Sequence, residues 1–119
     1  MVFNLTPHSI TICDAAGNKI VELPNCGWEL RLKTSIEPAG SIEGYPLTKT
    51  IFGTPEIGKS KFYSGQEDPW TEQYKHYFIV SQLVKTSYIG SSVYDFLLVP
   101  AEVVRDAAGN IQGCKSLGI

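Results

Sequence analysis

Apolar and polar residues alternate with a period of two along much of this chain, and no segment sustains an apolar stripe of helical period beyond about two turns. Two alternating segments, residues 9–13 and 19–23, flank the turn sequence Asp14-Ala15-Ala16-Gly17-Asn18 and predict a β-hairpin. An aspartate opens such a turn through side-chain hydrogen bonds, and Gly17 supplies the positive φ that closes it. The pattern predicts a protein built mainly of β-strands.

The same five turn residues recur at 106–110, between residues 103–105 and residues 111–114. They predict a second hairpin of the same kind. Because the residues that flank the two turns do not match, we interpret the repeat as two uses of one stable turn rather than as an internal duplication.

The alternation of apolar and polar side chains is strictest in residues 28–34. Trp28, Leu30 and Leu32 share one face of this predicted strand, and the charged residues between them share the other face, which is turned to solvent or to a ligand. Further strands and one short helix are expected at 41–43, 47–52, 77–80, 94–99 (ended by Pro100) and, for the helix that Ser81 caps, 82–86.

Residues 53–75 are rich in glycine, proline, serine and charge, and they predict a long loop or excursion that folds over a site or a partner. Within them, residues 53–60 match the Gly-x-x-x-x-Gly-Lys-Ser pattern of a phosphate-binding loop. That loop needs a preceding strand and a long following helix in a parallel sheet, for which this chain leaves no room, so we reject it. The 119 residues are expected to form one β-rich domain, a small antiparallel barrel or sandwich of hairpins with one short helix.

Composition limits the function more than the fold. Ten Lys and Arg against twelve Asp and Glu give a formal charge of −2, without the basic field that bulk nucleic-acid binding requires. No apolar run approaches the roughly 20 residues of a membrane-spanning helix, and the first ten residues lack the pattern of a signal peptide. Three cysteines without Cys-x-x-Cys spacing indicate free thiols in a reducing cytoplasm.

The candidate binding residues have side chains suited to an anion or a flat ring. Arginine captures phosphate or carboxylate with two hydrogen bonds, lysine and hydroxyl groups assist, and loop aromatics stack. The candidates are Thr6, His8, Arg31, Lys49, Ser81 and Arg105, with Tyr45 or Trp70 for stacking. A purely structural role is the alternative for each: Asn4 and Thr6 bonding the local backbone, and Arg31 paired with a neighbouring carboxylate.

No catalytic set, metal-ligand spacing or cofactor motif emerges from the sequence. A cysteine nucleophile remains as a minor alternative, Cys26 or Cys114 served by His8 or His76. An enzyme is therefore the less favoured interpretation.

Three segments together carry a resemblance. They are the Leu-Thr-Pro-His motif at residues 5–8, the segment from Tyr77 to Val84, and the Val-Arg-Asp-x-x-Gly-x-x-x-Gly-Cys motif at residues 104–114. The chain resembles, over most of its length, a family of small uncharacterised proteins of phages and bacteria that has no assigned catalytic residues. The resemblance implies a phage or prophage protein acting in the cytoplasm of a host cell. Small phage proteins of this kind are often counter-defence factors, and some sequester nucleotide signals of host immunity.

Two interpretations of the function follow. The first is a non-enzymatic binding protein that sequesters a small anionic, nucleotide-like ligand, with a site between the subunits of a homo-oligomer as one arrangement. The second is a protein-interaction module, either an inhibitor of a host defence protein or a virion or assembly component, whose exposed strand edges and long loop form the interface.

Overall fold

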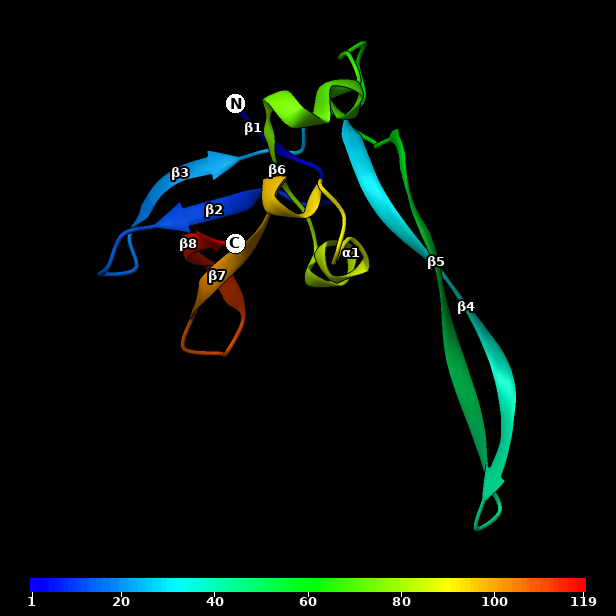
Figure 1. The fold of residues 1–119 in the computed structure, drawn as a ribbon. Helices are drawn as coiled ribbons and strands as arrows, with labels where there is room; N and C mark the ends of the chain where they lie inside the picture. Colours follow the sequence, from blue (N-terminus) through cyan, green and yellow to red (C-terminus); the bar gives the residue numbers. More distant parts are fainter.

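The structure, a computed structural model, describes residues 1–119 and consists of a six-stranded body and a long two-stranded arm (Figure 1). The sheet of the body has the strand order β1 (Val2–Asn4), β6 (Tyr77–Ile79), β7 (Leu97–Arg105), β8 (Ile111–Gly118), β2 (Ile10–Cys13) and β3 (Lys19–Leu23). The arm pairs β4 (Trp28–Ile42) with β5 (Tyr45–Lys59). The helical elements are η1 (Pro69–Lys75), α1 (Gln82–Ser87) and η2 (Tyr94–Phe96). The predicted fold class, mainly β with a barrel-like sheet, is confirmed, although the sheet is not antiparallel throughout.

The sheet of the body is mixed. Its two hairpins, β2–β3 and β7–β8, are antiparallel, as expected. Parallel pairing joins them where β2 meets β8, and it also joins β6 to both β1 and β7. A bridge between Asn4 and Asn25 links the ends of the two edge strands, so the sheet nearly closes on itself.

The two identical turn sequences form the same turn, and both predicted hairpins are confirmed. In each turn the aspartate side chain accepts hydrogen bonds from the second and fourth following amides at 2.9–3.0 Å. Gly17 and Gly109 have φ of +87° and +86°, a backbone conformation that residues with a Cβ rarely adopt. The hydrogen bond from the Asn18 amide, with others in the turn, holds the pKa of Asp14 below its ordinary value.

The arm is longer than the sequence pattern predicts. The strand expected at 28–34 continues to Ile42, and β5 continues through Pro55 to Lys59. Prolines are tolerated because each strand of a two-stranded ribbon has one edge without a partner, where a missing N–H breaks no ladder hydrogen bond. The expectation of a loop across residues 53–75 holds only for residues 60–68, because residues 53–59 are strand and residues 69–75 are η1. The rejection of a phosphate-binding loop is confirmed, because its glycines and lysine lie in β5.

The predicted central strand and short helix are confirmed. Phe78 and Ile79 of β6 are fully buried, and Ser81 caps α1 by accepting a hydrogen bond from the Val84 amide at 3.2 Å. The strand expected to end at Pro100 instead runs from Leu97 to Arg105. Because the pairing of β7 with β6 stops at Leu98, no neighbouring strand requires an N–H from Pro100 on that side.

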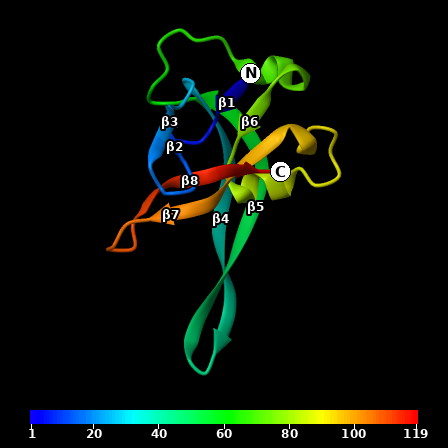
Figure 2. The same ribbon diagram turned by 90° about the vertical axis from the view of Figure 1, so that its left-hand side faces the viewer.

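A seven-residue core joins the body, α1 and the base of the arm. It consists of Leu5, Leu30, Phe78, Val80, Val84, Val93 and Leu97. Beyond this base the arm extends away from the rest of the molecule, as two perpendicular views show (Figures 1 and 2). None of the helices is long and apolar enough to cross a membrane.

Asn25 ties the N-terminal loop to both strands at the base of the arm. Its side-chain nitrogen donates to the carbonyl oxygens of Thr6 and Trp28, both at 2.8 Å. Its side-chain oxygen accepts from the Gly27 amide at 2.7 Å and from the Ser60 hydroxyl at 2.6 Å. Asn25 is 8% exposed, so these partners replace water for groups that would otherwise be costly to bury.

Candidate functional site

A groove of about 490 Å³ lies where the N-terminal loop, the first half of β4 and α1 meet. We call it the Arg31 groove. It is lined by Thr6, Pro7, Glu29, Leu30, Arg31, Leu32, Thr34, Ser81, Leu83 and Val84. Its volume falls within the range of roughly 300–1,000 Å³ typical of small-molecule sites, and apolar walls with a few polar groups are also typical of them.

The polar centre of the groove is the pair Glu29 and Arg31, two residues apart on one face of β4. Arg31 Nε donates a hydrogen bond to Glu29 Oε2, while the two terminal nitrogens of Arg31 have no hydrogen bond within the chain. The Glu29 side chain is 5% exposed and the Arg31 side chain is 67% exposed. The hydrogen bond to Glu29 raises the pKa of Arg31 above its ordinary value. The groove therefore presents a fixed cation with free donors beside an almost buried carboxylate.

Two hydroxyl groups flank this pair, and both have structural partners. Thr6 Oγ1 lies 2.6 Å from Asn4 Oδ1 and 2.9 Å from the His8 carbonyl oxygen, so its proton is engaged within the N-terminal loop. This is the local role weighed as the alternative for Asn4 and Thr6. Ser81 Oγ accepts the capping hydrogen bond of α1 and is not a donor to any group of the chain. The Ser81 proton thus remains available to a ligand.

The structure brings Thr6, Arg31 and Ser81 together in one groove and leaves the other candidates outside it. His8 is exposed beyond the groove, and Tyr45 and Lys49 lie on the arm. The Trp70 ring packs against Phe78 and Tyr88 at centroid distances of 5.1 and 5.9 Å, so it belongs to the core margin rather than to a stacking site. Arg105 donates to the Gly109 carbonyl oxygen at 2.9 Å and closes the second hairpin.

Sequence reasoning missed the burial of Glu29, which it assigned to a charged face. The Glu-x-Arg spacing on one strand face was the available signal, since residues two apart on a strand point the same way. It also missed Leu83, whose place in the groove depends on how α1 packs against the arm.

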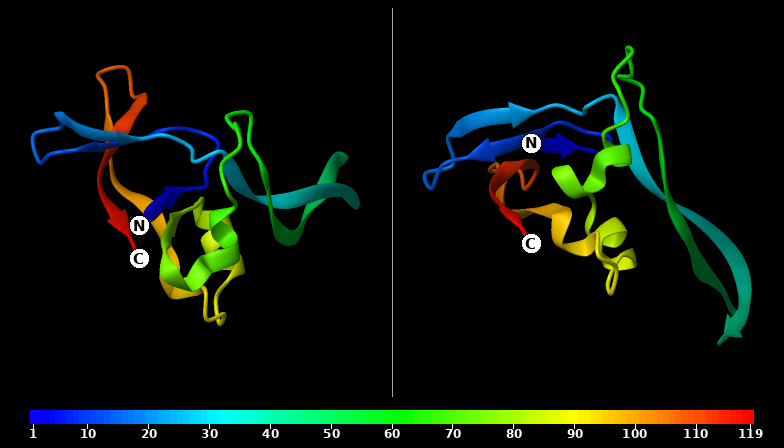
Figure 3. Two further views of the ribbon diagram at one scale, coloured as in Figure 1. Left: turned by 90° about the horizontal axis from the view of Figure 1, so that it is seen from above. Right: turned by 45° about the horizontal axis from the view of Figure 1, so that its top comes forward.

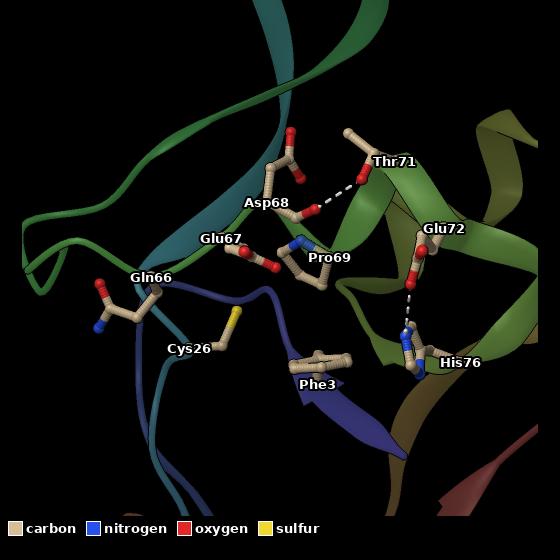
Figure 4. A pocket seen from close by; sticks show the side chains of 9 residues that line it. All are labelled: Phe3, Cys26, Gln66, Glu67, Asp68, Pro69, Thr71, Glu72 and His76. Atoms are coloured by element: carbon tan, nitrogen blue, oxygen red, sulfur yellow. Dashed lines mark hydrogen bonds and ion pairs between the residues drawn. The ribbon is translucent and has the colours of Figure 1, made fainter.

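A second cavity, of about 550 Å³, lies between β1 and the segment around η1 (Figure 4). It is lined by Phe3, Cys26, Gln66, Glu67, Asp68, Pro69, Thr71, Glu72 and His76. Its three carboxylates disfavour an anionic ligand. No three of the His, Cys, Asp and Glu side chains in the chain are arranged to hold a metal ion.

The cysteine and histidine in this second cavity do not form a nucleophile and base. In Figure 4 the ring of Phe3 lies between the Cys26 thiol and His76. Cys26 Sγ contacts the Trp28 carbonyl oxygen at 3.8 Å, and His76 Nε2 lies 3.8 Å from Glu72 Oε2. Burial raises the pKa of the thiols of Cys26 and Cys114, which keeps both protonated and weakly nucleophilic at neutral pH.

The fold and the groove define a small, mainly β protein with one apolar-walled groove at the root of a projecting arm. No protein-family model, curated protein or solved structure matches the chain. The chemistry of the groove and of the arm therefore provides the evidence on function.

Proposed function

We propose that the protein is a non-enzymatic binding protein that captures a small anionic, nucleotide-like ligand in the Arg31 groove. The observation that carries the proposal is the meeting of Thr6, Arg31 and Ser81, three residues distant in sequence, in one groove of suitable volume. The free terminal nitrogens of Arg31 suit a phosphate group, which accepts two hydrogen bonds from a guanidinium.

The carboxylate of Glu29 refines the class of ligand. The charges of Arg31 and Glu29 formally balance in the groove. A simple anion therefore gains less binding free energy here than a ligand whose hydroxyl groups also donate hydrogen bonds to Glu29. A ribose phosphate offers both, with hydroxyl groups for Glu29 and a phosphate for Arg31. Leu83 of α1, which is exposed at the groove, supplies apolar surface for a base. These properties together favour a ribonucleotide over a simple phosphate.

We propose a phage or prophage setting, which the motif resemblance supports and the groove does not address. A phage protein in the cytoplasm of its host that holds a nucleotide signal without turning it over would blunt a defence response. Sequestration requires affinity and no catalytic group, and the free terminal nitrogens of Arg31 supply hydrogen-bond donors for such binding.

Binding of ribonucleotides to the purified protein tests this proposal. Native mass spectrometry with a panel of linear and cyclic ribonucleotides should show an unaltered adduct, and the 2′-deoxy counterparts should bind more weakly. Replacing Arg31 by Ala removes charge-assisted hydrogen bonds of about 1.5–3 kcal/mol, so titration calorimetry should show affinity reduced roughly 10- to 100-fold.

Arg105→Ala is the matched control for Arg31→Ala, because Arg105 bonds only to its own hairpin. It should leave the affinity unchanged. Equal affinities for the wild type and Arg31→Ala would refute the site, and a changed ligand mass would show turnover and refute sequestration.

The projecting arm supports a second function, that of a protein-interaction module. Its exposed apolar side chains include Ile36, Ile42, Tyr45, Leu47, Ile51 and Phe52. Exposed apolar surface grouped on one element is typical of protein-protein contact sites. A purified complex that dissociates when these side chains are made polar, and that contains no small molecule, would favour this function.

A further inference from the structure

The arm leaves an unusually large surface without intramolecular contacts. Residues 33–54 are exposed without exception, and the ribbon views show this part of the arm standing clear of the body (Figures 1 and 3). A two-stranded ribbon on its own is marginally stable in water. The outer arm therefore lacks the packing that usually keeps such a ribbon ordered.

The excess surface has the size of a protein interface. The accessible surface of the chain is 7853 Å², whereas a compact monomer of this mass exposes roughly 6,400 Å². The radius of gyration is 16.9 Å, against about 13.5 Å for a compact chain of this length. The excess of roughly 1,500 Å² is more than the ~800 Å² that each member of a stable complex ordinarily buries.

One face of the outer arm is apolar with a charged centre. The strand β5 has no bulge between residues 45 and 52, so Tyr45, Leu47, Lys49 and Ile51 project to the same side. Ile42 lies directly opposite Tyr45, and Glu37 lies directly opposite Lys49, so these two residues of β4 share that side. We call these six residues the Tyr45 face: Glu37, Ile42, Tyr45, Leu47, Lys49 and Ile51.

The charges of this face are complementary to the same face of another copy. Glu37 and Lys49 form no ion pair within the chain. In a two-fold symmetric contact, residue i of one copy meets residue j of the other and the reverse. A two-fold axis that lies within the contact, runs along the arm and passes midway between β4 and β5 brings Glu37 of each copy to Lys49 of the other, with apolar side chains on both sides of the pair.

The edges of the arm are less suited to association than this face. Pro38 in β4, and Pro46 and Pro55 in β5, lack the N–H that a further strand would need at an open edge. Prolines in edge strands generally oppose continued strand pairing. Packing of faces is therefore favoured over extension of the sheet.

We propose that the Tyr45 face binds the Tyr45 face of a second copy of this chain, so that the protein is a two-fold symmetric dimer joined through its arms. The contact buries Ile42, Leu47 and Ile51, which are 60%, 41% and 39% exposed in the single chain. This proposal is independent of the Arg31 groove, because Arg31 does not belong to the Tyr45 face.

Charge exchange across the axis provides a sharp test. Sedimentation velocity should give the wild type the mass of two chains. Glu37→Lys places lysines against lysines and Lys49→Glu places glutamates against glutamates, so each variant alone should have the mass of one chain. An equimolar mixture of the two variants restores both opposite-charge pairs and should again show the mass of two chains.

The mixture also excludes a simple folding defect, because misfolded chains would not reassemble on mixing. Ile36→Ser is the matched control for Ile51→Ser: both are exposed isoleucines of the outer arm, but Ile36 lies opposite Thr50 on the other face. Ile51→Ser should dissociate the dimer and Ile36→Ser should not. A monomeric wild type at all concentrations, association only with a different protein, or a dimer that both charge variants leave intact would overturn the proposal.

Discussion

Replacing Asn25 by Leu is expected to lower the free energy of unfolding by about 3–5 kcal/mol, close to the whole stability of a marginal domain. The change keeps the approximate volume of the side chain and removes all its hydrogen bonds. The carbonyl oxygens of Thr6 and Trp28 lose their donor, and the Gly27 amide and the Ser60 hydroxyl lose their acceptor. Each polar group left buried without a partner costs roughly 1–3 kcal/mol.

Urea unfolding followed by tryptophan fluorescence measures this loss, since Trp28 and Trp70 both pack against the core. Asn110→Ala is the matched control. Asn110 is exposed and its side chain donates and accepts no hydrogen bond within the chain, so stability should change by less than about 0.5 kcal/mol. A loss below about 1 kcal/mol for Asn25→Leu would mean that water reaches the base of the arm and replaces these bonds.

Replacing Gly113 by Ala should destabilise the body by about 2–3 kcal/mol, through crowding rather than through backbone strain. A Cβ added at Gly113 would lie 2.6 Å from the Thr11 carbonyl oxygen and 2.9 Å from Cys13 Sγ. Both atoms belong to β2, which pairs with β8 in parallel through Ile12 and Cys114. The two strands must separate to admit the methyl group, and the contact that joins the two hairpins weakens.

Gly58→Ala is the control for this change, because nothing lies within 4 Å of the added Cβ and the φ of Gly58 is not positive. Its melting temperature, measured by circular dichroism, should match that of the wild type or exceed it slightly. Equal melting temperatures for Gly113→Ala and Gly58→Ala would contradict the close approach of β2 and β8.

The hairpins, the central strand and the short helix could be predicted because the interactions that form them are local. Asp14 bonds to amides two and four residues away, and Ser81 bonds to an amide three residues away. Such contacts join residues within about four positions of each other, so the local sequence is enough to predict them. The unbroken apolar residues from Phe78 to Val80 likewise indicated a strand covered on both faces.

The arm and the true extent of β7 could not be predicted in the same way. Pro100 was expected to end a strand and Pro55 to lie in a loop, yet both lie within strands because no neighbour needs their N–H. Whether a proline breaks a sheet depends on which strands flank it, and that is a property of the tertiary structure.

The types of residue in the candidate groove could be predicted, but which of the candidate residues lie in it could not. The criterion of a side chain suited to an anion identified Arg31, Thr6 and Ser81. The same criterion also selected Arg105 and Lys49, which lie elsewhere. Only the packing of α1 against the base of the arm separates the two sets. The near-complete burial of Glu29 follows from the same packing.

Local sequence is sufficient to specify the strand-rich class, the two identical hairpin turns and the cap of α1, because turn chemistry and alternation act over a few residues. The tertiary structure alone decided the projection of the arm, the meeting of Arg31 with Ser81 and the position of the Tyr45 face. These features depend on contacts between residues distant in the chain, for which neither propensity nor periodicity specifies a partner.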